Sequence, residues 1–431
     1  MNERILKLAI PSIVSNVTVP LLGLVDVAIV GHLGSAAYIG AIAVGGMLFN
    51  MIYWMFAFLR MGTSGLTSQA FGRRDLKETS LVFARSVGVA ISLGLLLIIF
   101  QSLILHIAFR FIHTTEEIQE LAKLYFRVCI WGAPAMLGLY SFAGWYIGMQ
   151  NSRFPMYIAI VQNVVNIISS LCFVFIFKMG VEGVAFGTLV AQYSGFLLAA
   201  VLWHSYYHRL WLLIDVNRII ESKALRSFFL LNKDIFFRTL CLIAVTTIFT
   251  SQGAGKGEII LAVNTLLMQL FTLFSYVMDG FAYAAEALTG RYVGAKNIDG
   301  LKRMLRVLFA WGFALSLSFT ALYVLGGESF LALLTDEKAV LESASEYACW
   351  TWCIPLAGMA AFLWDGIYIG ATASRQMLYS MMIAAFCFFV VYWCLQVRLG
   401  NHALWLAFIL YLFLRGLVQT CLASVIFRKV I

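Results

Sequence analysis

The stretch VPLLGLVDVAIV, residues 19–30, ends a long apolar run that begins near Leu6. A helix needs roughly 20 apolar residues to cross a bilayer, and this run is long enough. Asp26 nevertheless places a carboxylate inside it. An ionisable group within a membrane span is costly to insert and typically serves proton or ion chemistry. The stretch therefore predicts a membrane helix that carries a functional acid.

The rest of the chain repeats this apolar pattern. Hydrophobic residues make up 62% of the sequence and charged residues only 12%, whereas soluble domains are about a quarter charged. Twelve apolar runs can be distinguished: 7–31, 40–69, 81–107, 124–148, 155–177, 181–204, 235–253, 258–287, 304–326, 346–369, 378–397 and 403–427. We therefore predict an all-α integral membrane protein with twelve transmembrane helices, the first of them an uncleaved span rather than a signal peptide.

The basic residues predict the orientation in the membrane. With the N-terminus in the cytoplasm, 21 Lys and Arg residues fall on the cytoplasmic side. The opposite side holds seven: Arg110, Lys123, Arg127, Lys178, Lys256, Lys338 and Arg398. This asymmetry predicts a multi-pass protein of the inner or plasma membrane with both termini in the cytoplasm. Because the basic residues are spread over short loops and form no single face, we expect no nucleic-acid partner.

The chain also contains an internal repeat. IGMQNSRFPM, residues 147–156, matches IGATASRQML, residues 369–378, so that Gly148 and Gly370 lie 222 positions apart. Each half holds six predicted spans, and an even number makes both halves enter the membrane from the same side, as in a parallel repeat. We predict an N-terminal lobe at 1–204, a cytoplasmic linker at 205–233 and a C-terminal lobe at 234–431. Two such lobes imply alternating access.

The intramembrane acids do not follow this repeat. The counterpart of Asp26 falls in AVTTIF, residues 244–249, which contains no acid, and the counterpart of Asp365 is Ala143. Acids that occur in only one lobe favour a chemical role over a structural one. Asp26 also follows Pro20, and a proline inside a helix frees a carbonyl and bends the helix. We expect Asp26 to respond to protonation, the alternative being a structural aspartate bonded to hydroxyl groups.

Two further acids are candidates. Asp365 lies in the middle of the tenth span, and Asp279 lies deep in the eighth, near two tyrosines. For Asp279 two interpretations stay open, a coupling site or half of a buried pair with Arg238 or Arg415.

Polar residues in the fifth and sixth spans form another group, which includes Asn166 and Thr188. They predict either helix-packing hydrogen bonds or a network around Asp26.

The sequence contains no sign of an enzyme or an ATP-driven pump. SQGAGKGE, residues 251–258, resembles a phosphate-binding loop, but Thr250 and Gly257 stand where that motif requires Gly and Ser or Thr. The eight cysteines form no CxxC pair, and we expect no metal site. An ion gradient is therefore the expected energy source.

Five segments resemble one family of transporters. They are IPSIVSNVTVPLLGLVDVAIVGHLG, FLRMGTSGLTSQAFGRRD, LNKDIFFRTL, YVMDGFAYAAEALTGRYVGAKN and LWDGIYIGATASR, at residues 10–34, 58–75, 231–240, 276–297 and 363–375. They are similar to segments of the multidrug and toxic compound extrusion (MATE) family, and most of all to its bacterial DinF branch. The resemblance implies cation-coupled antiport of amphipathic, often cationic, organic compounds.

The resemblance also implies roles for single residues. Asp26 matches the acid of the family's first helix, and Asn166 and Thr188 match its polar partners in the fifth and sixth helices. Some members carry an aspartate one turn after that asparagine, where this chain has Ser170. Asp365 falls near an acid that sodium-coupled members use, whereas the glutamate of their seventh helix has no match here.

We therefore predict a monomeric proton-driven exporter of small organic compounds in the lipid bilayer. Its ion-coupling or substrate residues are predicted to be Asp26, Asn166, Thr188, Asp365 and Asp279, with H⁺ as the coupling ion and no cofactor. Two alternatives stay open. One is a sodium-coupled drug antiporter. The other is a flippase for lipids or lipid-linked precursors, although the predicted spans hold few cationic residues for a diphosphate, mainly Arg60, Arg238 and Arg415.

Overall fold

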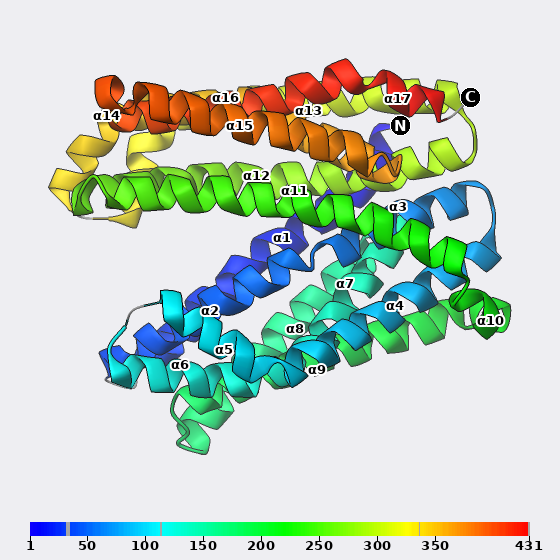
Figure 1. Cartoon of the computed structure of the whole chain (residues 1–431), viewed down its shortest axis with the longest axis horizontal. Coiled ribbons are helices and arrows are strands. Elements are labelled where there is room, and N and C mark those ends of the chain that lie inside the picture. Colours follow the sequence, from blue (N-terminus) through cyan, green and yellow to red (C-terminus); the bar gives the residue numbers. More distant parts are fainter. Residues whose placement is uncertain (32–34, 113, 336, 430–431) are drawn as a thin grey trace. The chain divides into compact units, whose positions relative to one another are not determined.

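The computed structural model describes residues 1–31, 35–112, 114–335 and 337–429, and these are almost entirely helical (Figure 1). No strand occurs among these residues, so the all-α fold class is confirmed. The chain forms two compact units. One consists of Val14–Phe229, and the other consists of Met1–Ile13 together with Leu230–Ile431. The predicted lobe boundaries at 204 and 234 stay a prediction.

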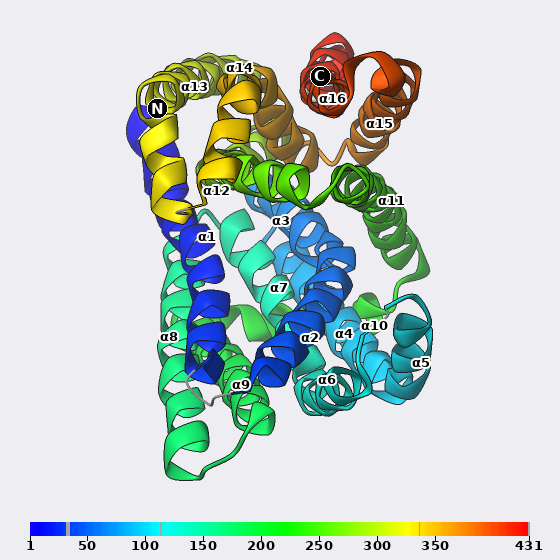
Figure 2. The same ribbon diagram turned by 90° about the vertical axis from the view of Figure 1, so that its left-hand side faces the viewer.

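The unit Val14–Phe229 holds the second part of α1 (Asn2–Gly31) and the nine helices that follow it. These are α2 (Ala36–Met55), α3 (Phe58–Gly72), α4 (Leu76–Ile99), α5 (Gln101–Phe111), α6 (Glu116–Cys129), α7 (Ala133–Gly148), α8 (Arg153–Leu171), α9 (Val181–Tyr207) and α10 (Val216–Ile219). Within the unit, α7 packs on α3 and α4, α6 packs on α2, and α8 lies beside α9 (Figure 2).

The other unit holds the start of α1, most of α11 (Ser222–Ala254), and six further helices. These are α12 (Glu258–Gly294), α13 (Ile298–Leu334), α14 (Lys338–Gly370), α15 (Ser374–Leu399), α16 (Asn401–Leu422) and α17 (Ser424–Arg428). Helix α14 packs on α12, α13 and α16, and α15 lies beside α16 (Figure 2).

The helices are long and apolar enough to cross a membrane. Among the described residues, ten helical segments have the length and hydropathy of a membrane span. Helices α1 and α11, with 30 and 33 residues, cover the remaining predicted runs at 7–31 and 235–253. Each of the twelve predicted runs therefore lies on helical structure, although the structure divides several of them between two helices.

Some predicted spans differ from a single straight helix. The run 40–69 contains α2 and α3, which are separated at Phe56 and Ala57. The run 81–107 likewise contains α4 and α5, with Phe100 between them. The break at Phe56 and Ala57 has no adjacent polar or glycine residue, whereas the break at Phe100 comes directly before Gln101 and Ser102. The side chain of Pro20, which predicted a bend in α1, lies outside the described residues.

The internal repeat is visible in the turns. Asp75 and Asn297, which are 222 positions apart, both begin a helix as side-chain caps. Asp75 Oδ1 accepts a hydrogen bond of 2.9 Å from the backbone N–H three residues on, and Asn297 Oδ1 accepts one of 2.7 Å. The residue before each cap, Arg74 or Lys296, has a positive φ of 60° or 52°. The same local sequence thus closes the same turn in both halves.

Close helix contacts repeat at the same spacing. A methyl group on Gly144 of α7 would overlap the carbonyl oxygen of Arg60 on α3. A methyl group on Gly366 of α14 would overlap the carbonyl oxygen of Ala282 on α12. Both members of each contact differ by 222 positions from their counterparts. Small residues let helix backbones approach closely in membranes, so the repeated glycines determine which helices pair in each half.

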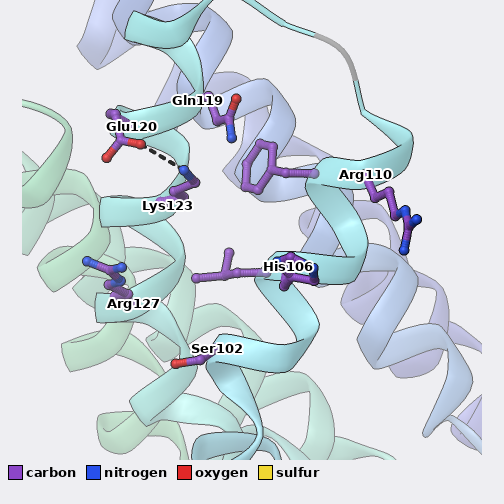
Figure 3. A pocket seen from close by; sticks show the side chains of 9 residues that line it. Ser102, His106, Arg110, Gln119, Glu120, Lys123 and Arg127 are labelled. Atoms are coloured by element: carbon purple, nitrogen blue, oxygen red, sulfur yellow. Dashed lines mark hydrogen bonds and ion pairs between the residues drawn. The ribbon is translucent and has the colours of Figure 1, made fainter.

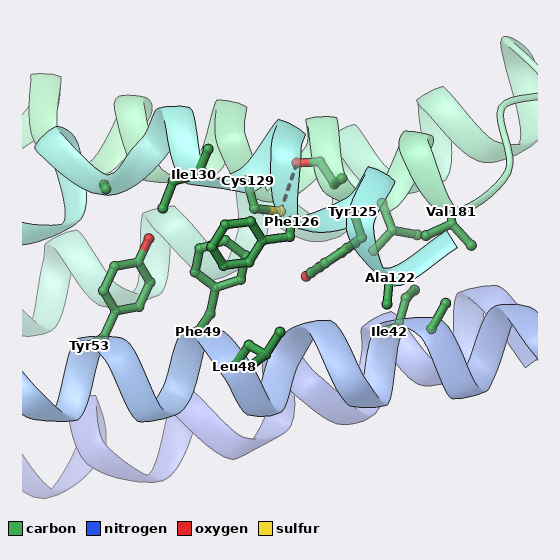
Figure 4. Packing of buried hydrophobic residues seen from close by; sticks show 14 of the residues in the cluster. Ile42, Leu48, Phe49, Tyr53, Ala122, Tyr125, Phe126, Cys129, Ile130 and Val181 are labelled. Carbon is green, nitrogen blue, oxygen red and sulfur yellow. Dashed lines mark hydrogen bonds between the residues drawn. The ribbon is translucent and has the colours of Figure 1, made fainter. Parts of the chain in front are cut away.

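An aromatic core connects α2, α6 and α9 (Figure 4). Phe49 and Tyr53 of α2, one turn apart, stack at 5.6 Å between ring centroids, and Phe49 stacks on Phe126 of α6 at 4.8 Å. On the next turn, the Cys129 thiol donates to the Ala185 carbonyl of α9 at 3.7 Å. This packing fixes the register of α6, and with it the side chains that α6 turns toward α1.

Candidate functional site

Asp26 lies on the packed face of α1. Its side chain is 7% exposed, and Ile29 and Val30, three and four residues further on, are 5% and 0% exposed. Val27, on the opposite face, is 38% exposed. Asp26 Oδ1 has no hydrogen-bond partner among the described residues. A buried carboxylate oxygen without a partner is strongly disfavoured when ionised, so this group favours its neutral form unless water or a cation reaches it.

Two polar neighbours of Asp26 come from α6. Tyr125 and Cys129, one turn apart and both buried, lie within electrostatic range of the Asp26 carboxylate. Sequence analysis did not single out either residue. A signal for Tyr125 exists in the two adjacent glycines of AVGGM, because a methyl group on Gly45 would overlap the Tyr125 ring. Neither of these two neighbours is basic.

Polar residues of α8 and α9 lie next to Tyr125 of α6. Asn166 Nδ2 donates to Thr188 Oγ1 at 3.1 Å, so the structure brings these two predicted residues together. Thr188 is in turn a side-chain neighbour of the Tyr125 hydroxyl. Four polar side chains, each beside the next, therefore connect α1, α6, α9 and α8. They are Asp26, Tyr125, Thr188 and Asn166. We call these four residues the polar chain.

The polar chain has unused hydrogen-bonding capacity. Asn166 Oδ1 and Ser170 Oγ are buried and have no hydrogen-bond partner among the described residues. Ser170 lies one turn after Asn166 and packs against Gly187, where a methyl group would overlap its hydroxyl. These acceptors and the free Asp26 oxygen give this part of the unit the means to hold a proton, a water molecule or a cation.

Asp365 has a very different environment. Its Oδ2 accepts from Arg238 Nη2 of α11 and from Arg415 Nη2 of α16, the latter at 2.6 Å. Its Oδ1 accepts from Gln419 Nε2 at 2.7 Å. The Asp365, Arg238 and Arg415 side chains are all at most 8% exposed. This cluster ties α11 and α16 to α14 and stabilises the ionised form of Asp365.

The structure gives other partners to the two arginines that were considered for Asp279. Arg238 and Arg415, the two arginines considered as its partners, both bind Asp365 instead. Asp279 is half-buried on α12, and Tyr276, one turn before it, lies within its electrostatic range. Asp279 and Asp365 lie in the same unit, and Asp26 lies in the other.

Metal-ligand groups are not apparent in the part of the chain that the structure describes. No group of three or more His, Cys, Asp or Glu side chains there could hold a metal ion.

Comparison with known proteins identifies one family. The family model MatE matches residues 11–172 and 235–394. DNA damage-inducible protein F of Escherichia coli is 35% identical over 416 residues, which cover 96% of this chain and 90% of that protein. Protein DETOXIFICATION 44, chloroplastic, of Arabidopsis thaliana is 26% identical over 96% of this chain and 81% of its own length. A probable multidrug resistance protein NorM of Thermotoga maritima is 23% identical over 79% of this chain and 74% of its own length.

Solved structures share the fold. An outward-facing multidrug resistance MATE transporter of the MOP superfamily superposes with a TM-score of 0.87 at 20% identity, covering 99% of this chain and 96% of that one. A MATE structure in a bent conformation superposes with a TM-score of 0.86 at 19% identity, covering 100% and 96%. Both matches therefore extend over nearly the whole of this chain.

Proposed function

Because the chain belongs to the MATE family of multidrug efflux transporters, we propose that it is a proton-coupled antiporter that exports amphipathic, often cationic, organic compounds. In this proposal Asp26 is the proton-binding group, and Asn166 and Thr188 complete its site. The membrane is the inner or plasma membrane, with both chain termini in the cytoplasm, and the working unit is a monomer.

The buried and unpaired Asp26 oxygen is the observation that carries this proposal. An acid with a permanent basic partner stays ionised and cannot exchange a proton easily, and this is the situation of Asp365. Asp26 has no basic partner among the described side chains, so its charge is determined by whether a proton or another cation is bound. Alternating occupancy by a proton and by a cationic substrate would couple the two movements.

Sodium coupling is the second candidate. The free oxygens of Asp26, Asn166 and Ser170 are the ligand type that a hard cation prefers. Proton coupling is favoured because a single carboxylate provides little charge to dehydrate a sodium ion, whereas it is sufficient for one proton.

Efflux from proteoliposomes tests the proposal. We expect purified wild-type protein to move a lipophilic cationic dye when a pH gradient is imposed, and not when only a sodium gradient is imposed. Asp26→Asn should reduce this movement at least tenfold and leave the apparent Tm unchanged, because the substitution preserves shape and breaks no hydrogen bond to Oδ1. Glu258→Gln, which removes an exposed acid at the start of α12, is the matched control and should behave as wild type.

Two results would contradict the proposal. Efflux by Asp26→Asn at the wild-type rate would exclude Asp26 as the coupling acid. Movement driven by sodium alone, and lost in Asp26→Asn, would assign the site to sodium instead.

A further inference from the structure

Three neighbouring spans of the unit that holds α2 to α10 are interrupted, and their counterparts in the other unit are not. The interruptions lie at Phe56 and Ala57 between α2 and α3, at Phe100 between α4 and α5, and at a 3₁₀ turn, Ile130–Gly132, between α6 and α7. The positions 222 residues further on, which are 278–279, 322 and 352–354, lie inside the continuous helices α12, α13 and α14. The interruptions are therefore a property of one half of the repeat.

On one side of the interruptions, α3, α4 and α7 are closely joined. The Ser86 hydroxyl of α4 donates to Ser141 of α7 at 2.7 Å, and it is also hydrogen-bonded to the Thr63 hydroxyl of α3. These three side chains are fully buried. A methyl group on Gly94 of α4 would overlap the backbone of Pro134 at the start of α7. We call these three helices the α3–α4–α7 block.

On the other side of the interruptions, α2, α5 and α6 pack on one another. Phe49 of α2 stacks on Phe126 of α6 at 4.8 Å between ring centroids (Figure 4). Lys123 Nζ of α6 lies 5.6 Å from the centre of the Phe109 ring of α5. Figure 3 shows α5 and α6 side by side, with a pocket that side chains of both helices line. We call these three helices the α2–α5–α6 block.

Each interruption is a point where the chain passes from one block to the other. The turn from α3 to α4 stays within one block, and the connection from α5 to α6 stays within the other. At the first interruption, the N–H groups of Phe56 and Ala57 each bind the carbonyl three residues back, at 3.1 Å. Such 3₁₀ bonds inside a span have poorer geometry than α-helical ones and often mark a hinge. Rotation at these points would change the angle between the blocks and leave the packing inside each block intact.

Gln192 of α9 lies against the third interruption. Its side chain is 6% exposed, and a methyl group on Gly132 would overlap its Oε1 atom. Tyr53, near the end of α2, is a side-chain neighbour of Gln192. Gln192 also follows Thr188 of the polar chain by one helical turn. One residue of α9 therefore touches the turn between the blocks and lies next to the residues that surround Asp26.

The neighbours of Asp26 lie on one side of the interruptions. Tyr125 and Cys129, the titratable groups of α6 within its electrostatic range, belong to the α2–α5–α6 block. Asn166 and Thr188, on α8 and α9, are neutral amide and hydroxyl groups. An ionised Asp26 attracts the O–H and S–H dipoles of α6, and a protonated one attracts them less. A change of charge at Asp26 therefore acts directly on one block and not on the other.

We propose that the α2–α5–α6 block turns as one body relative to the α3–α4–α7 block about the three interruptions, and that the charge of Asp26 determines its position. This inference rests on the proposed role of Asp26 as the proton-binding group. Gly132 is the residue that permits the turn, because it leaves room for Gln192 beside the backbone. The motion is internal to one unit, so it adds a conformational step to the exchange of a proton at Asp26.

Distances between spin labels in the purified full chain test the motion. Labels on genetically encoded side chains leave the eight cysteines in place. One label replaces Arg73 at the end of α3, and the second replaces either Ile107 of α5 or, as the control, Leu95 of α4; all three positions are exposed. The Arg73–Ile107 pair spans an interruption, whereas the Arg73–Leu95 pair lies within the α3–α4–α7 block.

We expect the mean Arg73–Ile107 distance of the otherwise wild-type chain to differ by about 3 Å or more between acid and alkaline buffer. Asp26→Asn should keep the acid distance in both buffers, because its side chain cannot ionise. The Arg73–Leu95 distance should stay the same throughout.

Gly132→Ala tests the turn itself. Its methyl group displaces the Gln192 amide and restricts the backbone, so the pH-dependent change at Arg73–Ile107 should fall by about half or more, and efflux about tenfold, with unchanged binding of the dye. Gly46→Ala on α2, where the methyl group meets open space, is the matched control and should behave as wild type. If Gly132→Ala does not fold, Gln192→Ala, which empties the space beside Gly132, should broaden the Arg73–Ile107 distribution.

The possible failures are distinguishable. An Arg73–Ile107 distance that ignores pH, in a protein whose efflux is lost in Asp26→Asn, would refute the hinge and leave the proton site standing. Equal changes in both label pairs would mean that the two blocks are not separate bodies. A distance that changes with pH in Asp26→Asn as it does in wild type would overturn the link to Asp26, and an unaltered distribution in Gln192→Ala would overturn the role of the turn at Gly132. Wild-type efflux by Asp26→Asn would instead overturn the proposed function.

Discussion

Replacing Asp365 with asparagine should destabilise the protein rather than simply uncouple transport. In the wild type, Oδ2 accepts from two guanidinium groups and Oδ1 accepts from Gln419 Nε2. An asparagine amide places an NH₂ group against donors in either orientation, facing the arginines in one and Gln419 in the other. The change also leaves Arg238 and Arg415 buried without a counter-charge. Removing one partner of a buried ion pair costs about 3–5 kcal/mol.

Thermal unfolding in detergent measures this cost. For a unit of this size, a loss of about 3 kcal/mol lowers Tm by roughly 6 °C or more. Asp26→Asn is the matched control, since it makes the same substitution at a buried aspartate whose Oδ1 has no hydrogen bond, and its Tm should stay within about 1 °C of wild type. Adding Arg415→Gln to Asp365→Asn should restore part of the lost stability, because it removes one of the two uncompensated charges.

The opposite result would refute this reasoning. If Asp365→Asn kept the wild-type Tm and lost only gradient-driven efflux, the cluster would not be a structural ion pair, and Asp365 would be a coupling acid. A double variant with losses that simply add would likewise show that Asp365 and Arg415 do not depend on each other.

Two further predictions concern helix contacts. Gly144→Ala and Gly366→Ala should each lower the free energy of unfolding by about 1–3 kcal/mol, because the added methyl group overlaps a backbone carbonyl of the facing helix. Gly88→Ala on α4, where the methyl group meets open space, is the control and should leave stability unchanged. Equal Tm values for all three variants would contradict the steric argument. Asn264→Leu should lower the free energy of unfolding by about 2–4 kcal/mol, because the buried Asn264 side chain exchanges two hydrogen bonds of 2.9 Å with Asn401 and accepts a third from Trp405 Nε1. Tm and helix content measure this loss of stability. A variant as stable as wild type would mean that water replaces Asn264 as the partner of Asn401 and Trp405.

The apolar pattern was sufficient to predict the helices but not their interruptions. The predicted runs are helical because about 20 apolar residues in lipid can satisfy their backbone hydrogen bonds only as a helix. The interruption at Phe56 and Ala57 lies within a continuous apolar stretch, so no residue there predicts it. Breaks of this kind depend on packing against neighbouring helices, and hydropathy does not report packing.

The site was predictable to a similar degree. Asp26 stood out because an acid within a membrane span is rare, and Asn166 and Thr188 lie where hydrogen bonding brings them together. Tyr125 and Cys129 escaped notice because a tyrosine and a cysteine in an apolar run look like ordinary packing residues. The partners of Asp365 also escaped, since Arg238 and Arg415 lie 127 and 50 residues from it along the chain. One sequence does not show which distant charges meet.

The presence or absence of a basic partner separates Asp365 from Asp26 more clearly than their burial does. Turns and glycine contacts recur at a spacing of 222 residues, so the scaffold is shared by both halves. None of the ionic cluster recurs: Asp365, Arg238 and Arg415 correspond at that spacing to Ala143, Asn16 and Tyr193. The acid and its two arginines are therefore confined to one half, where they form a charge-compensated cluster that stabilises helix packing. Asp26 is also confined to one half but has no compensating base among the described residues, and its cost is best explained by transport.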